Sequence, residues 1–278
     1  MNKVIYKGKN RYREFLSVAK IISRKISKIE GVVGIVATGG IGRGYCDDYS
    51  DLDLIVYVEE EKVKEIKEYI AVGYLRYKDI ELDTPVESYQ KALNYKVPSR
   101  YWSQVQRWEI GNALVLFDTK GRIKDLFKEK LIFPDREQKI LLEKHRQEVE
   151  FHLKYNFETW EKRGDMINLA DSLIRGTESL ILWIYAKNRK FQPFTSKWLF
   201  YYLENKMVPE SKYLKLIKKP YLEPVKAIKQ ARDIRNELLK LCSRIGIKFD
   251  YDKVEDIFKQ NEKNYEKTSE KTKYYLSW

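Results

Sequence analysis

The sequence predicts an α+β protein, with a short mixed β-sheet in its first half and only helices afterwards. Two observations lead to this prediction. Apolar runs typical of strands alternate with amphipathic helical segments up to about residue 133, and the strand signals then stop. The composition, 43% hydrophobic and 34% charged, is that of a globular chain. We therefore expect an α/β domain over residues 1–133 and an all-helical domain over residues 134–278.

The first domain is predicted to alternate helices and strands. Residues 10–30 carry apolar side chains at helical spacing, and the apolar run "GVVGIVATGG" after them ends in glycines, as a buried strand and its turn do. In "DLDLIVYV", residues 51–58, two faces alternate, which predicts a strand. The later segments are expected to be a helix over 59–70, a strand over 79–85, helices over 86–95 and 100–111, a strand over 112–119 and a helix over 121–131.

The second domain begins after a break at Pro134 and is predicted to be helical throughout. The helix expected over residues 165–190 has an apolar stripe, and Glu178 falls on it; the stripe consists of Ile167, Ala170, Ile174, Ile181 and Tyr185. An acid on an apolar face costs stability unless it is paired or used, so Glu178 is a candidate functional residue. Its structural alternative is an ion pair with Arg175, three residues earlier. The other helices are expected over 136–163, 194–205, 222–244 and 251–262.

The charge and the cysteines limit the classes of function. A net charge of +13 is compatible with a nucleic-acid partner, a polyphosphate ligand or a basic surface. The positive excess is spread along the chain, which weakens the case for nucleic acid. The sequence contains no apolar run of membrane-spanning length and no signal-peptide pattern, and Cys46 and Cys242 form no metal or disulfide pattern. We therefore expect a cytoplasmic protein that does not associate with membranes.

The stretch "TGGIGRGYCDDYSDLDLIV", residues 38–56, sets a glycine turn before two aspartates. Asp51 and Asp53 are two residues apart on the predicted strand, so their side chains project from the same face. Two carboxylates so close repel each other unless a positive charge lies between them. Mg²⁺ prefers carboxylate and phosphate oxygens, and a glycine turn leaves backbone N–H groups free to approach a polyphosphate. The stretch therefore predicts a site for a metal-bound nucleotide.

The same residues resemble the signature of the DNA polymerase beta-like nucleotidyltransferase superfamily, which is Gly-Gly or Gly-Ser, about ten residues, then Asp-apolar-Asp-apolar. In pattern the chain is most similar to the small-molecule branch, the kanamycin and lincosamide nucleotidyltransferases. That branch commonly has Ser and Ala where this chain has Gly40 and Gly42, and Arg43 follows its pattern. The resemblance implies a nucleotidyltransferase catalytic domain over residues 1–133 and a helical acceptor-binding domain over residues 134–278.

The resemblance also implies roles for individual residues. Asp51 and Asp53 would hold two Mg²⁺ ions together with a third acid on a later strand. In "KDIELDTP" that acid is Glu81, and Asp83, on the same side of the strand, is the alternative. The branch carries a glutamate base on a helix of its second domain, for which Glu178 is the candidate. Contacts to the nucleotide are expected from Thr38, Gly39, Gly40, Arg43, Ser50 and Lys197.

Three of these nucleotide contacts have structural alternatives. Arg43 could instead pair with Asp47 or Asp48. Ser50 could cap or shape the turn into the strand rather than touch a ligand. Lys197 could be a solvated lysine at the start of a helix. The sequence leaves each of these alternatives open.

The predicted reaction is the transfer of a nucleoside monophosphate, with ATP as the expected donor, to a hydroxyl of a small molecule such as an antibiotic, with release of pyrophosphate. A polycationic aminoglycoside would need an acidic cleft, which the net charge does not support, and a neutral lincosamide or sugar-like acceptor fits no worse. The alternatives are an enzyme that acts on tRNA, another RNA or a protein side chain, and a non-catalytic partner-binding protein on the same fold. A homodimer is compatible with the sequence.

Overall fold

The computed structural model of the protein describes residues 9–73, 76–95, 104–218 and 220–221. The described residues up to Leu214 belong to one compact unit, and a second unit begins at Lys215. The strands of the described residues, and the helices that surround the site described below, belong to the first unit. The predicted domain boundary between residues 133 and 134 stays a prediction. The helices predicted over 222–244 and 251–262 lie outside the described residues.

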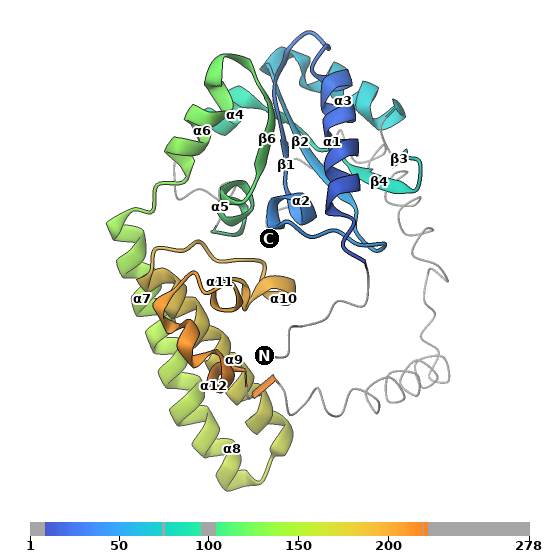
Figure 1. Ribbon diagram of the computed structural model, residues 1–278. Helices are drawn as coiled ribbons and strands as arrows, with labels where there is room; N and C mark the ends of the chain where they lie inside the picture. Colours follow the sequence, from blue (N-terminus) through green and yellow to red (C-terminus); the bar gives the residue numbers. More distant parts are fainter. Residues whose placement is uncertain (1–8, 74–75, 96–103, 219, 222–278) are drawn as a thin grey trace, which may run out of the picture. The chain divides into compact units, whose positions relative to one another are not determined.

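The sheet is mixed, as the sequence predicts. Its six strands are β1 (Val32–Ala37), β2 (Leu52–Val58), β3 (Arg76–Tyr77), β4 (Ile80–Asp83), β5 (Val86–Ser88) and β6 (Leu114–Asp118). The order across the sheet is β3-β4-β2-β1-β6, and β5 also pairs with β2 (Figure 1). β2 runs antiparallel to β1 and parallel to both β4 and β5. The acid-bearing strand β2 is therefore central in the sheet.

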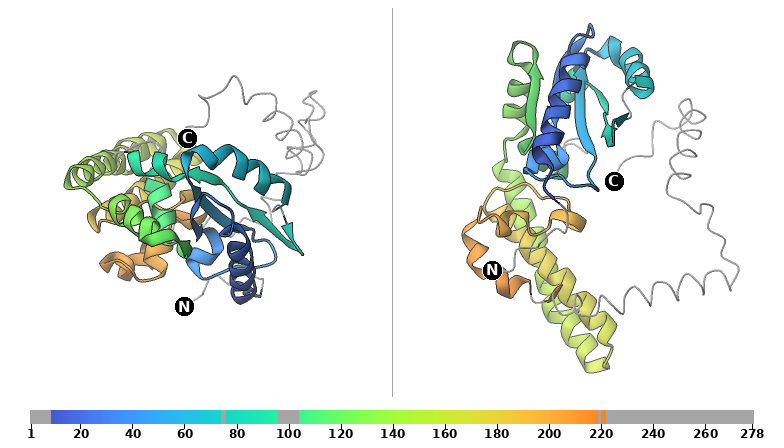
Figure 2. Two further views of the ribbon diagram at one scale, coloured as in Figure 1. Left: turned by 90° about the horizontal axis from the view of Figure 1, so that it is seen from above. Right: turned by 45° about the vertical axis from the view of Figure 1, so that its right-hand side comes forward.

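Helices cover both faces of this sheet (Figure 2). One face, with the buried Leu52 and Leu54 of β2, packs against α1 (Tyr12–Ile26) and α3 (Val63–Gly73). The other face carries Tyr57 and packs against α4 (Tyr89–Asn94), α5 (Gln104–Gly111) and α6 (Arg122–Lys130). Between β1 and β2 lies the short helix α2 (Gly39–Arg43). The 3-10 turns η1 (Glu60–Lys62) and η2 (Thr119–Gly121) precede α3 and α6.

Beyond Pro134 the described residues form only helices, as the sequence predicts. The long helices α7 (Asp135–Glu150) and α9 (Met166–Lys187) lie side by side (Figure 1). The predicted helix over 136–163 is interrupted by the π-helix η3 (Phe151–Asn156) and ends with α8 (Phe157–Arg163). In the described ranges no helix is both long and apolar enough to cross a bilayer. Short helices follow: α10 (Thr195–Trp198), α11 (Tyr201–Glu204), η4 (Pro209–Tyr213) and α12 (Leu214–Ile217).

A buried ion pair joins α5 to α7. The guanidinium of Arg107 donates to both carboxylate oxygens of Glu137, and the two side chains are 1% and 10% exposed. Glu137 also accepts a hydrogen bond from Gln104 Nε2 at 2.7 Å. The other end of the Gln104 amide accepts from the backbone N–H of Gln192 at 3.1 Å. The helix that borders the site is thus tied to the helical part of the same unit.

Candidate active site

The turn between β1 and β2 lies directly against Asp53. The backbone N–H of Thr38 donates to the Asp53 carbonyl at 3.1 Å, which fixes the start of the turn beside β2. Gly39 has a φ of +49°, and a Cβ atom there would lie only 1.5 Å from Asp53 Oδ2. Glycine is needed at this position, because any side chain would displace the carboxylate. The structure thus brings together Thr38, Gly39 and Asp53, three of the predicted site residues.

Gly42 lets α2 approach the end of α5. A Cβ atom at this position would lie 2.6 Å from the backbone oxygen of Asn112, so the alanine common in the resembling branch does not fit here. Asn112 in turn accepts a hydrogen bond from the Tyr201 hydroxyl at 3.0 Å. Gly42, the residue before Arg43, therefore lies where α2, α5 and α11 meet.

Asp53 faces a second aspartate across the sheet. The parallel register of β2 and β4 sets Asp83 opposite Asp53, whereas Glu81 is the register partner of Arg76 of β3. Both acids of β4 are exposed. Burial, followed by the negative charges of Asp51 and Asp83, raises the pKa of Asp53 to about 6. The structure therefore brings Asp83, the alternative third acid, opposite Asp53, and Glu81 lies two residues before Asp83 on β4.

A cavity of about 220 Å³ lies between this face of the sheet and α5, and Asp53 and Asp83 are on its wall. Two further acids line it, Glu87 of β5 and Glu109 of α5. Burial raises the pKa of Glu87 to about 7 and also raises that of Glu109, although Arg43 opposes the shift of Glu109. Among the described residues that line the cavity there is no lysine or arginine. The site is thus acidic although the whole chain is basic.

Sequence reasoning missed both Glu87 and Glu109. Residues 86–88 were expected to begin a helix, but they form β5, whose Glu87 is the register partner of Tyr57. Glu109 lies between the buried residues Trp108 and Ile110. An acid between two apolar residues, near the end of a predicted helix, is the one signal that could have found it.

Arg43, at the end of α2, lies between two aromatic rings. Its Cζ atom is 4.0 Å from the centre of the Trp198 ring and 5.8 Å from that of Trp108. The alternative pairing with Asp47 or Asp48 is not formed, because Asp48 binds Arg11 and Asp47 binds Ser50. Arg43 therefore stays available to a ligand at the glycine turn.

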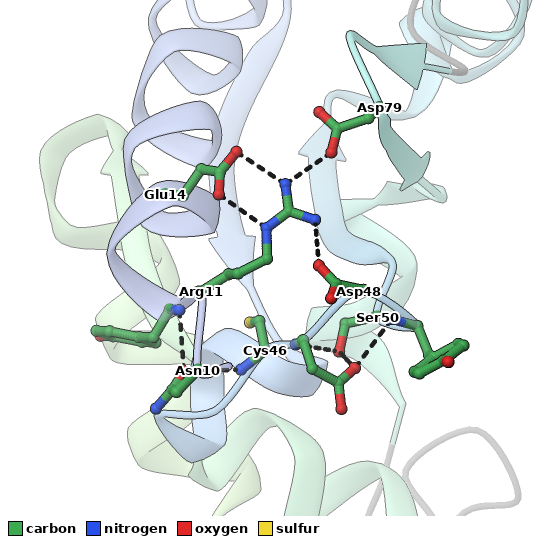
Figure 3. Close-up of polar contacts among 10 residues, drawn as sticks. Asn10, Arg11, Glu14, Cys46, Asp48, Ser50 and Asp79 are labelled. Atoms are coloured by element: carbon green, nitrogen blue, oxygen red, sulfur yellow. Dashed lines mark hydrogen bonds and ion pairs between the residues drawn. The ribbon is translucent and has the colours of Figure 1, made fainter. Parts of the chain in front are cut away.

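Ser50 shapes the turn into β2. Its hydroxyl donates to Asp47 Oδ1 at 3.0 Å and accepts from the Asp47 backbone N–H at 2.9 Å (Figure 3). The same loop is held to the residues before α1, since Cys46 N–H donates to Asn10 Oδ1 at 3.3 Å and Arg11 N–H donates to the Cys46 carbonyl at 2.7 Å. The structural alternative proposed for Ser50 thus matches its contacts.

The Arg11 guanidinium binds three carboxylates from three segments of the chain (Figure 3). Glu14 of α1 accepts two hydrogen bonds at 2.8 Å, Asp48 accepts one at 3.0 Å and Asp79 one at 2.7 Å. Asp48 precedes Asp51 in the loop into β2, and Asp79 precedes β4. The hydrogen bonds from Arg11 lower the pKa of Glu14 and Asp79. One side chain therefore joins the approaches to both acid-bearing strands.

Glu178 and Lys197 lie on α9 and α10, and neither lines the cavity. Burial lowers the pKa of His145 of α7, and the nearby charges of Glu148 and Glu178 oppose this shift. Arg175, the alternative partner of Glu178, binds Asp171 at 2.7 Å instead. Lys197 is exposed. The roles predicted for Glu178 and Lys197 stay predictions.

Comparison with known proteins gives a limited match. Residues 102–199, about a third of the chain, match a family described as a domain of unknown function (DUF4037). No curated protein matches. Among solved structures, the chain is similar to a nucleotidyltransferase-like protein from Exiguobacterium sibiricum 255-15, with 12% identity and a TM-score of 0.34, over 65% of this chain and 60% of that chain. The chain thus spans less than two thirds of that protein's length.

The donor set of the cavity suits a hard divalent cation. Asp53 and Asp83 line the cavity, Asp51 lies two residues before Asp53, and all three offer only carboxylate oxygens. Besides burial, the charges of Asp51 and Asp83 disfavour the ionised form of Asp53, which a cation would relieve. In the described ranges, no three acidic, histidine or cysteine side chains are already gathered around one point as metal ligands. A bound cation would therefore have to draw the carboxylates closer together.

Glu87 is expected to destabilise the fold above neutral pH. Its pKa is raised from 4.5 to about 7, so between these values the folded state holds a proton that the unfolded state has lost. The contribution of Glu87 to the free energy of unfolding therefore falls as the pH rises through this window. Glu87→Gln should be more stable than the wild type at pH 8, by up to about 3 kcal/mol. Thermal unfolding at several pH values measures the difference, which should vanish near pH 4; a constant difference would contradict this assignment.

Proposed function

We propose that the protein is a metal-dependent nucleotidyltransferase, which moves a nucleoside monophosphate from an NTP to a hydroxyl of a small molecule and releases pyrophosphate. ATP is the expected donor. The observation that carries the proposal is the contact of the glycine turn with β2, where the Asp53 carboxylate lies against Gly39 and opposite Asp83 on the wall of a cavity. Transfer from a triphosphate needs such a combination, a turn with free backbone N–H groups beside paired carboxylates.

The residues would act as follows. Asp51, Asp53 and Asp83 would hold the Mg²⁺ ions, because Asp83 is the register partner of Asp53 and the charges of Asp51 and Asp83 act on Asp53. When bound, Mg²⁺ supplies positive charge that steadies the triphosphate and the in-line transition state. Gly39 and Gly40, which follow Thr38 in the turn, would offer backbone N–H groups to the phosphates, and the guanidinium of Arg43 would add charge-assisted hydrogen bonds.

The acceptor hydroxyl must lose a proton, and the cavity favours Glu109 over Glu178 as the base. Glu109 lines the same cavity as Asp53, and its charge is among those that act on Asp53. Burial raises its pKa, which brings a carboxylate closer to the range in which a general base is effective. Glu178, by contrast, is not among the residues that line the cavity.

The acceptor is proposed to carry positive charge. The cavity is lined by four acids, of which Glu87 is needed neither as a metal ligand nor as the base in this proposal. A compound with both an amine and a hydroxyl would pair its amine with Glu87 and present the hydroxyl to the nucleotide and to Glu109. The net charge of +13 gave no support to an aminoglycoside-like antibiotic, but the charge that matters to a small molecule is that of the cavity.

This function is tested with ATP labelled at its α-phosphate, by following the molecule to which the label is transferred. The protein is incubated with labelled ATP and Mg²⁺, with an aminoglycoside, a lincosamide, bulk tRNA or no acceptor. We expect label on the amine-bearing acceptor and none in EDTA. Label on tRNA or on the protein itself would favour a macromolecular acceptor. If no acceptor is labelled with any of the four NTPs or with Mn²⁺, the proposal is wrong.

A further inference from the structure

We propose that Trp198 is a positioning residue, which holds the guanidinium of Arg43 in place for the phosphates of the nucleotide. The inference rests on the proposed function for the identity of the ligand. Arg43 ends α2 at the glycine turn, whereas Trp198 ends α10 in the helical part of the same unit. The Arg43 Cζ atom lies over the Trp198 ring, 4.0 Å from its centre. This distance is well within the range of a cation–π interaction.

Few other interactions hold Arg43. Among the ion pairs between described residues none includes Arg43, and its Nε atom is buried without a hydrogen-bond acceptor. A long side chain keeps one orientation only when something restrains it. Here the restraint comes from two ring faces, those of Trp198 and, at 5.8 Å, Trp108.

The two rings differ in how firmly they are fixed. Trp108 of α5 is 1% exposed and meets Tyr201 edge to face at 5.4 Å, so it forms a rigid wall. Trp198 is the nearer ring, and it is only partly buried on a four-residue helix. Substitution of Trp198 should therefore release Arg43 with little damage to the core, whereas substitution of Trp108 would disturb the fold.

A guanidinium held by its face keeps its edge free for an oxyanion. The planar fork of arginine donates N–H groups in its own plane, so stacking on an indole does not use them. Burial lowers the pKa of Arg43, and the negative charges of Asp53 and Glu109 oppose this shift although neither carboxylate forms a direct ion pair with it. Bound phosphate would supply the direct acceptors that this cation lacks. Trp198 would then strengthen phosphate binding only through Arg43.

A double-mutant cycle tests this dependence. Binding of Mg²⁺–ATP and of inorganic triphosphate with Mg²⁺ is measured by calorimetry for the wild type, Trp198→Leu, Arg43→Met and the double variant. We expect Trp198→Leu to weaken both ligands about tenfold, the range of a partly desolvated cation–π contact. In the Arg43→Met background it should change the affinity less than twofold. Trp183→Leu is the matched control, because Trp183 lies 5.6 Å from Lys187 Nζ on α9 in the same kind of pair.

Two outcomes would overturn the inference. If Trp198→Leu weakens binding equally in both backgrounds, Trp198 does not act through Arg43. If it leaves the affinity unchanged, or changes it no more than Trp183→Leu, Trp198 is only a packing residue. Should Trp198→Leu fail to fold, Trp198→Phe replaces it, with an expected loss of about threefold because the smaller ring binds a cation more weakly.

The inorganic probe separates this inference from the proposed function. If triphosphate binds with the expected dependence on Trp198 and Arg43 but no label moves from ATP to any acceptor, the positioning role stands and the nucleotidyltransferase proposal is wrong. If label moves but triphosphate and ATP bind independently of Trp198, the enzyme proposal stands and the positioning role is wrong. If neither Mg²⁺–ATP nor triphosphate binds to the wild type, both proposals are wrong.

Discussion

Asp53→Asn is expected to lower the rate of nucleotidyl transfer by at least about 10³-fold while the fold stays intact, because a metal-dependent site loses both a ligand and a negative charge. Burial and the charges of Asp51 and Asp83 raise the pKa of Asp53 to about 6, so at pH 8 the ionised carboxylate is unfavourable in the folded state. The nearly isosteric amide removes this cost. The melting temperature at pH 8 should therefore be equal to that of the wild type or higher.

Two variants of β4 provide the matched comparison. Asp83→Asn should lower the rate about as far as Asp53→Asn, since Asp83 is its register partner and shares its cavity. Glu81→Gln, on the same face of the same strand but outside the cavity and opposite Arg76, should lose less than about tenfold. A large loss in Glu81→Gln alone would restore Glu81 as the third ligand. Full activity in Asp53→Asn with Mg²⁺ present would end the nucleotidyltransferase proposal.

Arg107→Met is expected to lower the free energy of unfolding by about 3–5 kcal/mol, because it leaves the Glu137 carboxylate buried without its cation. The two side chains are 1% and 10% exposed, so water cannot replace the lost partner. The variant also loses the contact of the Arg107 guanidinium with the Phe191 ring, at 4.5 Å. Urea denaturation followed by circular dichroism measures the loss at equilibrium.

An exposed pair serves as the control for this loss. Arg175 and Asp171 are bound at 2.7 Å, but their side chains are 62% and 52% exposed, so Arg175→Met should cost less than about 1 kcal/mol. Removal of both charges in Arg107→Met/Glu137→Leu should recover much of the stability lost in the single variant. A loss below about 1 kcal/mol in Arg107→Met would mean that α5 and α7 are held together by other contacts.

Most elements of the fold could be predicted because their periodicity is set by burial. β1 is buried along its whole length, and β2 alternates between two faces, as the apolar patterns of 32–37 and 52–58 indicate. Shorter elements escaped prediction. β5 has three residues, too few to show a period, and it runs into α4 without a break. The stripe predicted on α9 holds at Ile181, which is fully buried, but Ile167 at its other end is 82% exposed.

Only part of the candidate site could be predicted from the sequence, for a similar reason. Local spacing was enough to select Asp51 and Asp53, because alternation along one strand fixes their common face. The choice between Glu81 and Asp83 depends on the register of β4 against β2, which is set by contacts distant in the sequence. The acid of α5, Glu109, becomes a site residue only because that helix packs over the sheet.

The cluster of Arg11 with Glu14, Asp48 and Asp79 makes the site sensitive to ionic strength. Its three carboxylate partners are 51% to 64% exposed, so dissolved ions reach them readily. Raising the ionic strength weakens such pairs, whereas the more buried Asp53 is screened much less. Concentrated salt therefore acts first on the loop before β2 and the hairpin turn before β4. Because one guanidinium holds both, the two segments are released together. Salt should therefore loosen the segments that position the acids before it weakens the electrostatic interactions of Asp53 itself.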